Sequence, residues 1–267
     1  MRLYVNGIGT LGPGLGSWPE SRDALAGRCA YSETEPPEPS ASVLPPNERR
    51  RSSNTVRWAV DVAHQSLRHA QADAHEVATV FASSGGETDI LDRLCTALAT
   101  SDRVISPTLF HHSVHNAAAG YWGIATGSHQ SSTSSSCYDS SFPAGLLEAA
   151  AYADTERTPV LLVAYDLLLP PPLFPARPLA AGFAVAFVLG PTPSRQSFAQ
   201  LDLNLSNDPS GEATTMEDAR LEALRAGNPA ARSLPLLAAL ARGRRTSVSF
   251  EYLEDQHLLL HVTPWPS

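Results

Sequence analysis

The sequence predicts an α/β protein, because apolar residues at helical spacing alternate along the chain with short, β-branched apolar runs. Residues 55–70 place apolar side chains three and four positions apart, which is the spacing of one helix face, and residues 77–82 then form a run typical of a buried strand. The same order returns where a helix expected over residues 141–152 is followed by a strand expected over 160–165. Helices that alternate with buried strands pack on both faces of a sheet, so the expected architecture is a layered α/β sandwich.

The remaining elements of the first two thirds of the chain follow from the same patterns. Residues 3–8 form an apolar run typical of a buried strand, residues 7–16 form a glycine-rich loop, and a short helix is expected over residues 20–26. Residues 33–47 contain five prolines, which favours an extended surface loop. Further helices are expected over residues 90–98 and 114–124, and further strands over residues 131–137 and 183–189.

Beyond residue 193 the pattern is sparser. The expected elements are a strand near residues 198–205, a helical run that ends at 234–241, and two strands over 246–252 and 257–262 with an exposed acidic turn between them. We therefore expect residues 1–192 to form the main domain and residues 193–267 to form a small remnant that packs on it.

Composition and charge exclude several classes of function. The net charge of -8 disfavours nucleic acids and anionic membranes as partners, because both are polyanions that need a basic surface. No segment approaches the ~20 apolar residues of a membrane span, and the first strand pattern begins without a charged leader. We therefore expect a protein that is neither exported nor embedded in a membrane.

The cysteines and the basic residues narrow the chemistry further. The three cysteines, Cys29, Cys95 and Cys137, are odd in number and lack metal-ligand spacing, so we expect neither a disulfide framework nor a zinc site. A reducing cytoplasm is the expected location. All 19 basic residues are arginine, which excludes a Schiff-base lysine.

Gly7, Gly9 and Gly12 match the spacing of a dinucleotide-binding fingerprint, in which glycines let a pyrophosphate approach a helix N-terminus. In this chain Pro13 and Gly14 continue the loop where that helix would begin. We interpret the motif as a structural turn and expect no cofactor.

His111 and His115 stand four residues apart, the spacing of two zinc ligands on one helix face. The glutamate that a metalloprotease carries between its two histidines is missing, and no third ligand is evident. We therefore expect no metal here, and interpret the imidazoles as hydrogen-bonding groups at an interface.

Residues 106–149 carry short motifs in a fixed order: Ser106-Pro107, Asn116, Gly120, Gly127 and the run from Leu146 to Ala149. Their order and spacing resemble the active-site segment of the β-ketoacyl synthases, the condensing enzymes of the thiolase fold. An ungapped match places Asp139 where that family carries its cysteine nucleophile. A carboxylate is a weak nucleophile towards a thioester, and its charge opposes the oxyanion that would form beside it. The resemblance therefore implies a chain that does not catalyse condensation by itself.

The resemblance covers about residues 2–190. It implies a thiolase-like layered sandwich whose N-terminal half is complete and whose C-terminal half is truncated. The family takes two catalytic histidines and a lysine from that C-terminal half. This chain has no lysine, and its last histidines, His257 and His261, lie in or beside the final expected strand without a His-Gly-Thr loop.

A ketosynthase-like chain without the catalytic set is similar to a chain length factor, the inactive subunit that pairs with an active ketosynthase in polyketide and fatty-acid-like biosynthesis. The short C-terminal segment looks like the small variant of aryl polyene and xanthomonadin-type pigment pathways. The resemblance implies a heterodimer with a ketosynthase, contact with an acyl carrier protein through that partner, and no cofactor or metal. It also implies that the segment before Asn116 lines the partner's acyl tunnel; the segment comprises Thr108, Leu109, Phe110, His111 and His112.

Three alternatives remain open. Cys137 precedes the nucleophile position by two residues and could serve an acyltransferase or thioesterase together with His111, His112 or His115, although a buried structural cysteine is the simpler interpretation. Asp139 could equally be a helix-capping residue. The chain could also be a purely structural assembly module that stabilises a ketosynthase without shaping its tunnel.

Overall fold

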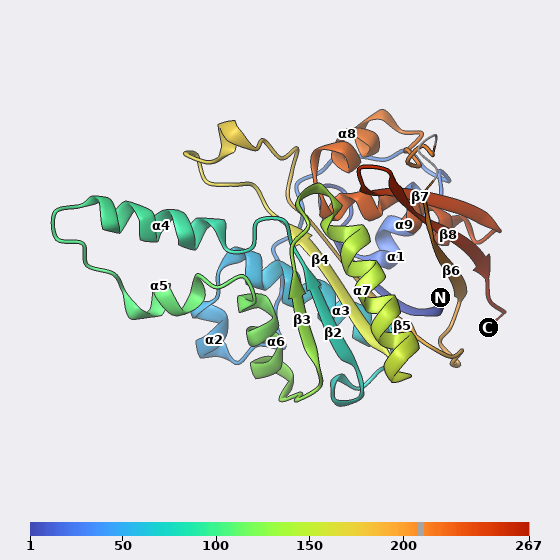
Figure 1. Ribbon diagram of the computed structural model, residues 1–267, viewed down its shortest axis with the longest axis horizontal. Coiled ribbons are helices and arrows are strands. Elements are labelled where there is room, and N and C mark those ends of the chain that lie inside the picture. Colours follow the sequence, from blue (N-terminus) through green and yellow to red (C-terminus); the bar gives the residue numbers. More distant parts are fainter. Residues whose placement is uncertain (208–210, 267) are drawn as a thin grey trace.

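In the residues that the computed structural model describes, 1–207 and 211–266, one sheet of eight strands forms the centre of the molecule (Figure 1). The strand order is β3-β2-β4-β5-β1-β6-β8-β7. Strands β3, β2 and β4 run parallel, and the other neighbouring pairs are antiparallel. The strands are β1 Arg2–Leu11, β2 Ala78–Ala82, β3 Ser132–Ser135, β4 Val160–Asp166, β5 Phe183–Gly190, β6 Ala199–Ser206, β7 Thr246–Leu253 and β8 Gln256–Pro264.

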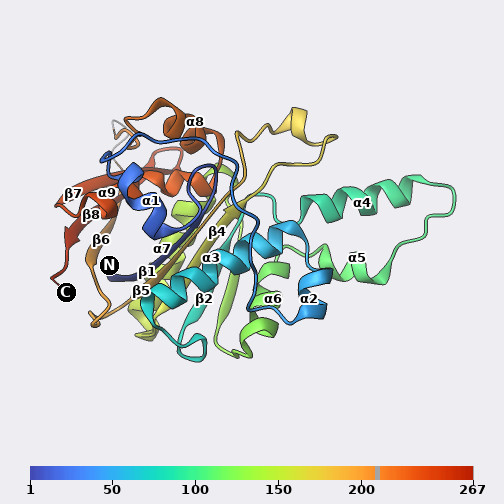
Figure 2. The same cartoon turned by 180° about the vertical axis from the view of Figure 1, so that it is seen from behind.

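Helices cover both faces of this sheet, as the alternating pattern predicts. Helices α3 and α6 pack on one face, and α1, α7, α8 and α9 pack on the other. Figure 2 shows α3 running across its face of the sheet. The helices are α1 Trp18–Leu25, α2 Pro46–Arg51, α3 Asn54–Ala70, α4 Thr88–Ala99, α5 Pro107–His112, α6 Ala117–Thr126, α7 Ser141–Glu156, α8 Ala219–Gly227 and α9 Leu234–Arg242.

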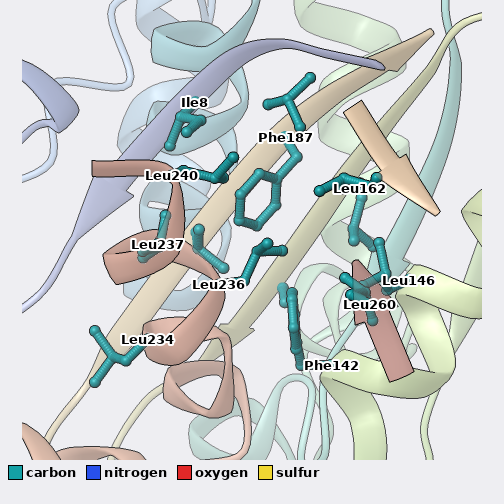
Figure 3. Close-up of a cluster of buried hydrophobic side chains, with 14 of the residues drawn as sticks. Ile8, Phe142, Leu146, Leu162, Phe187, Leu234, Leu236, Leu237, Leu240 and Leu260 are labelled. Atoms are coloured by element: carbon teal, nitrogen blue, oxygen red, sulfur yellow. The ribbon is translucent and has the colours of Figure 1, made fainter. Parts of the chain in front are cut away.

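The central strands β4 and β5 are buried along their whole length. Because side chains of a strand alternate between faces, Leu162 packs into the cluster with α7 and α9, whereas Leu161 packs into the cluster with α3. Figure 3 shows Phe187 in the first cluster, among residues from α9 and Phe142 of α7. This two-sided burial explains why the two strands are nearly continuous apolar runs.

Strand β1 is longer than the sequence indicates. It continues to Leu11, so the loop expected from Gly7 begins only after that residue. A Cβ atom on Gly7 would lie 2.2 Å from the Ser66 carbonyl oxygen, and one on Gly9 would lie 2.2 Å from that of Val62. The glycines therefore allow β1 to approach α3 closely, and the predicted turn is wrong for Gly7 and Gly9, which lie within this strand.

The C-terminal segment extends the same sheet. Strand β6 pairs with β1 on one side and with β8 on the other, and β7 forms the edge. The turn between β7 and β8 exposes the acidic residues Glu254 and Asp255. The boundary between residues 192 and 193 stays a prediction, and the strands on its two sides belong to one sheet.

Helices α4 and α5 and the loop that joins them project from the body of the molecule near the β3 edge (Figures 1 and 2). We call residues 87–114 the arm. The arm departs from the end of β2 and returns to α6. Among the described helices, none combines the length and the apolar character that a membrane span requires.

Candidate functional site

Asp139 lies where β3 gives way to α7. The chain leaves β3, makes one short 3-10 turn over Tyr138–Ser140, and enters α7 at Ser141. Tyr138 adopts a left-handed backbone conformation with φ of 50°. Such a conformation is uncommon for a residue with a side chain, and here it turns the chain sharply at the head of the helix. The position that the sequence matches to a nucleophile is therefore a tight turn at the carboxyl end of a parallel strand.

Two arginines hold the Asp139 carboxylate. Nη2 of Arg177 donates to Oδ1 at 2.8 Å, and Nη2 of Arg232 lies 3.5 Å from Oδ2. Arg232 also pairs with Glu251 at 3.1 Å, and the guanidinium of Arg177 stacks 3.6 Å above the centre of the Tyr138 ring. The side chains of both arginines are 17% exposed, whereas that of Asp139 is 46% exposed. The carboxylate thus stands between two largely buried cations.

This arrangement gives Asp139 a different task from capping. The N-cap of α7 is Ser140, and its side chain makes no capping hydrogen bond. The side-chain bonds of Asp139 go to guanidinium groups from distant parts of the chain. Arg177 follows the 3-10 turn η3 (Phe174–Ala176) in the β4–β5 loop, and Arg232 lies in the 3-10 turn η4 (Ala230–Ser233). Sequence analysis did not identify either arginine as a partner of this site.

Cys137 is half-buried, and its backbone N–H donates to Oγ of Ser141 at 3.1 Å. Two of the three imidazoles considered as its partners form hydrogen bonds elsewhere. Nε2 of His112 lies 2.9 Å from the hydroxyl of Tyr121, and Nε2 of His115 lies 3.0 Å from the Ser83 carbonyl oxygen. The first contact ties α5 to α6, and the second ties His115 to the residue that follows β2.

The expected tunnel segment forms α5 and the start of α6. Thr108, Phe110, His111 and Asn116 are exposed, and Leu109 and His112 are half-buried. A cavity of about 590 Å³ lies between α5, α6 and α2. Its lining includes the apolar residues Phe110, Val114 and Ile124.

A His–Tyr pair lines the same cavity. The rings of His112 and Tyr121 meet edge to face with centres 5.5 Å apart, in addition to their hydrogen bond. Burial lowers the pKa of His112 and raises that of Tyr121. The neutral forms of both side chains are therefore favoured at this wall.

Two buried carboxyl groups hold the segment at which the arm begins, residues 83–87, which we call the root of the arm. Oδ1 of Asp166 accepts hydrogen bonds from the hydroxyl groups of Ser83 and Ser84 and from the backbone of Ser84 and Gly85. Oε1 of Glu87, the residue at the start of α4, accepts from Ser53 at 2.9 Å. Burial raises the pKa of Asp166 to about 6 and that of Glu87 to about 7.

Within residues 1–207 and 211–266, no group of three or more His, Cys, Asp or Glu side chains is placed to hold a metal ion.

Comparisons with known proteins agree with the sequence resemblance. The family described as "Beta-ketoacyl synthase, N-terminal domain" matches residues 22–255. Among proteins with curated descriptions, none matches the chain significantly in sequence.

Solved structures show the same fold. A chain of the ketosynthase ApeO in complex with its chain length factor ApeC, from Xenorhabdus doucetiae, aligns with a TM-score of 0.73 and 24% identity over 98% of this chain and 99% of that chain. The ishigamide ketosynthase/chain length factor aligns with a TM-score of 0.72 and 12% identity over 100% of both chains. A β-ketoacyl synthase from Burkholderia phymatum STM815 aligns with a TM-score of 0.71 and 11% identity over 99% of this chain and 100% of that chain. The predicted thiolase-like fold is confirmed.

Proposed function

Because the chain belongs to the β-ketoacyl synthase family, we propose that it is the non-catalytic subunit of a ketosynthase pair, a chain length factor of the aryl polyene type. In this proposal the partner supplies the cysteine and histidines that condense carrier-bound acyl and malonyl units. This chain contributes the surface that limits how far the growing acyl chain can extend. The acyl carrier protein contacts the complex through the partner.

The observation that carries the proposal is the pairing of the Asp139 carboxylate with two arginines. A nucleophile has to present a free electron pair to the thioester carbonyl, and a neighbouring group has to stabilise the resulting oxyanion. Here the matching position holds a carboxylate that two arginines already neutralise. The absence of lysine from the sequence removes another member of the family's catalytic set. Both facts favour a subunit without condensing activity of its own.

Exposed apolar side chains support the need for a partner. Leu91, Leu98 and Val104 of the arm are 48%, 48% and 74% exposed, and Phe110 is 66% exposed. The neighbouring strand β3 pairs with β2 on one side and lies at the end of the sheet order, so its other side is a free edge among the described strands. Apolar surface beside a free sheet edge is typical of a protein–protein interface.

The cavity beside α5 supports a role in chain length. Its volume of about 590 Å³ is within the range of small-molecule pockets, and Phe110 and Ile124 give it apolar walls. Leu109 and Phe110 belong to the segment that the family places at the partner's acyl tunnel. We propose that these two side chains close the distal end of that tunnel.

Reconstitution with a ketosynthase tests this function. We expect the two chains to co-purify as a stable 1:1 complex that elongates carrier-bound acyl groups. Replacing Leu109 and Phe110 with alanine should open the tunnel end and shift the products to longer chains, which mass spectrometry of the carrier-bound products measures. An unchanged product distribution would contradict the role in chain length and would favour a purely structural assembly role for this chain.

Matched variants separate the alternatives. Leu205 and Leu253 are 48% and 53% exposed and lie on the C-terminal strands, so their replacement with alanine should leave product length unchanged. Cys137→Ala should leave the activity of the complex intact. Loss of activity together with loss of iodoacetamide labelling at Cys137 would instead favour the acyltransferase or thioesterase.

A further inference from the structure

The β4–β5 loop, residues 167–182, contains an exposed stretch that needs an anchor. Residues 171–176 are all exposed, and they include the apolar side chains of Leu173 and Phe174. Internal hydrogen bonds fold this stretch into a turn, since the N–H groups of Leu173 and Phe174 both donate to the Pro170 carbonyl at 2.9 Å. A turn of this size buries too little apolar surface to hold its position by itself.

The base of the loop is tied to η4 by one buried residue. The amide nitrogen of Asn228 donates to the carbonyl oxygens of Asp166 and Ala181 at 2.9 and 2.8 Å, which lie at the two ends of the loop. Its amide oxygen accepts from the backbone of Ala230 and Ala231. This residue fixes where the loop begins and ends, and it couples the loop to the turn that carries Arg232.

Asp139 ties the far part of the loop to the same turn. Its two carboxylate oxygens face different partners, Arg177 from the loop and Arg232 from η4. Both guanidinium groups are largely buried, so without the carboxylate two like charges would face each other away from water. The ion pairs therefore differ from an exposed surface pair, which contributes little.

We infer that Asp139 is a positioning residue that holds the β4–β5 loop and η4 against the N-terminal end of α7. The position that carries the nucleophile in the family therefore has a structural role in this chain. Arg177 connects the loop to the N-terminal end of α7, because its guanidinium stacks on the Tyr138 ring and donates a hydrogen bond to Asp139. Arg232 connects Asp139 to the C-terminal segment, because it also pairs with Glu251 of β7. The inference concerns the free chain and does not depend on pairing with a ketosynthase.

Hydrogen exchange of the full chain tests the inference. In Asp139→Asn we expect the bonded amides of Leu173, Phe174 and Arg177 to exchange at least about tenfold faster than in the wild type, because the loop loses its hold while its base stays tied. Asp154→Asn is the matched control. Asp154 lies on α7, the helix that follows Asp139, and pairs with Arg157 at 3.8 Å with both side chains more than half exposed, so its replacement should leave these rates unchanged.

Further variants separate positioning from general destabilisation. Asp139→Glu keeps the charge and should keep exchange slow, and adding Asp139→Asn to Arg177→Gln should produce no further acceleration at the loop amides. Equal acceleration in the loop and in α3 would show overall loss of stability and overturn the inference. Loop rates within about twofold of the wild type in Asp139→Asn would overturn it as well.

Discussion

The centre of the sheet and its β3 end differ in how their apolar residues are covered. At the centre, helices on both faces bury the sheet, and β4 and β5 have no exposed residue. At the β3 end, the arm and α6 leave Val104, Phe110 and Ile124 more than half exposed. The chain therefore completes its own core at the centre of the sheet, and at the β3 end it presents the kind of surface that a second protein covers.

Phenylalanines in these two regions give the largest contrast. Phe142 of α7 is fully buried and packs against Phe187 and Phe250 with ring centres 6.1 and 5.4 Å apart. Phe142→Ala should lower the free energy of unfolding by about 3–5 kcal/mol, because it leaves a cavity in the core. Phe110→Ala should change it by less than about 0.5 kcal/mol in the free chain. Urea unfolding of both variants measures the difference, and equal losses would break the comparison.

The root of the arm should make stability depend on pH. The pKa of Glu87 is raised to about 7, and burial is the largest cause. A carboxyl whose folded-state pKa is raised stabilises the fold fully below its unfolded pKa, and this contribution is lost as the pH rises through about 7.

The shift from 4.5 to about 7 corresponds to a loss on the order of 3 kcal/mol between about pH 4 and pH 8. Glu87→Gln cannot ionise and should remove that part of the decline, which urea unfolding across this pH range measures. Asp166, with a pKa of about 6, adds a decline of the same sign that the variant retains. Identical pH profiles for wild type and variant would show that Glu87 does not ionise at the root.

Two glycines, one in each region, should give the smallest changes in stability, and the changes should be opposite in sign. A Cβ on Gly145 of α7 would lie 2.7 Å from Ala82 Cβ and 3.1 Å from Leu162 Cδ1, so Gly145→Ala should cost about 1–3 kcal/mol of stability. A Cβ on Gly120 of α6 would meet no atom within 4 Å among the described residues of the free chain. Gly120→Ala should therefore stabilise the free chain by up to about 1 kcal/mol.

The same Gly120 variant should weaken binding to a ketosynthase if that helix face lies against the partner. Calorimetric titration of the partner into both proteins measures this effect. Unchanged affinity would place α6 outside the interface.

Much of the fold could be predicted because its elements have local signals. The apolar spacing of residues 55–70 and the β-branched run 77–82 predicted α3 and β2 within a few residues. The short helix α2 was missed, since Pro46 at its start belongs to a proline-rich stretch that predicted a continuous loop. Proline also suits the first turn of a helix, and only the following residues decide which role it has.

The candidate site was predictable at one residue and not at its partners. Asp139 was found because a family motif fixes its position relative to Gly127 and Leu146. Arg177 is 38 positions away in the sequence, and its pairing with Asp139 depends on the path of the β4–β5 loop. A linear pattern does not contain the distance between two side chains.

The place of β1 in the sheet has a consequence for how the chain folds. This strand lies between β5 and β6, so Arg2 pairs with Asp202 and Leu11 pairs with Ala184. During synthesis the first strand has no pairing partner until almost three quarters of the chain have left the ribosome. Contacts between residues so far apart close large loops, which makes folding slow. A newly made chain therefore exposes the apolar residues of β1 until β5 and β6 have been synthesised.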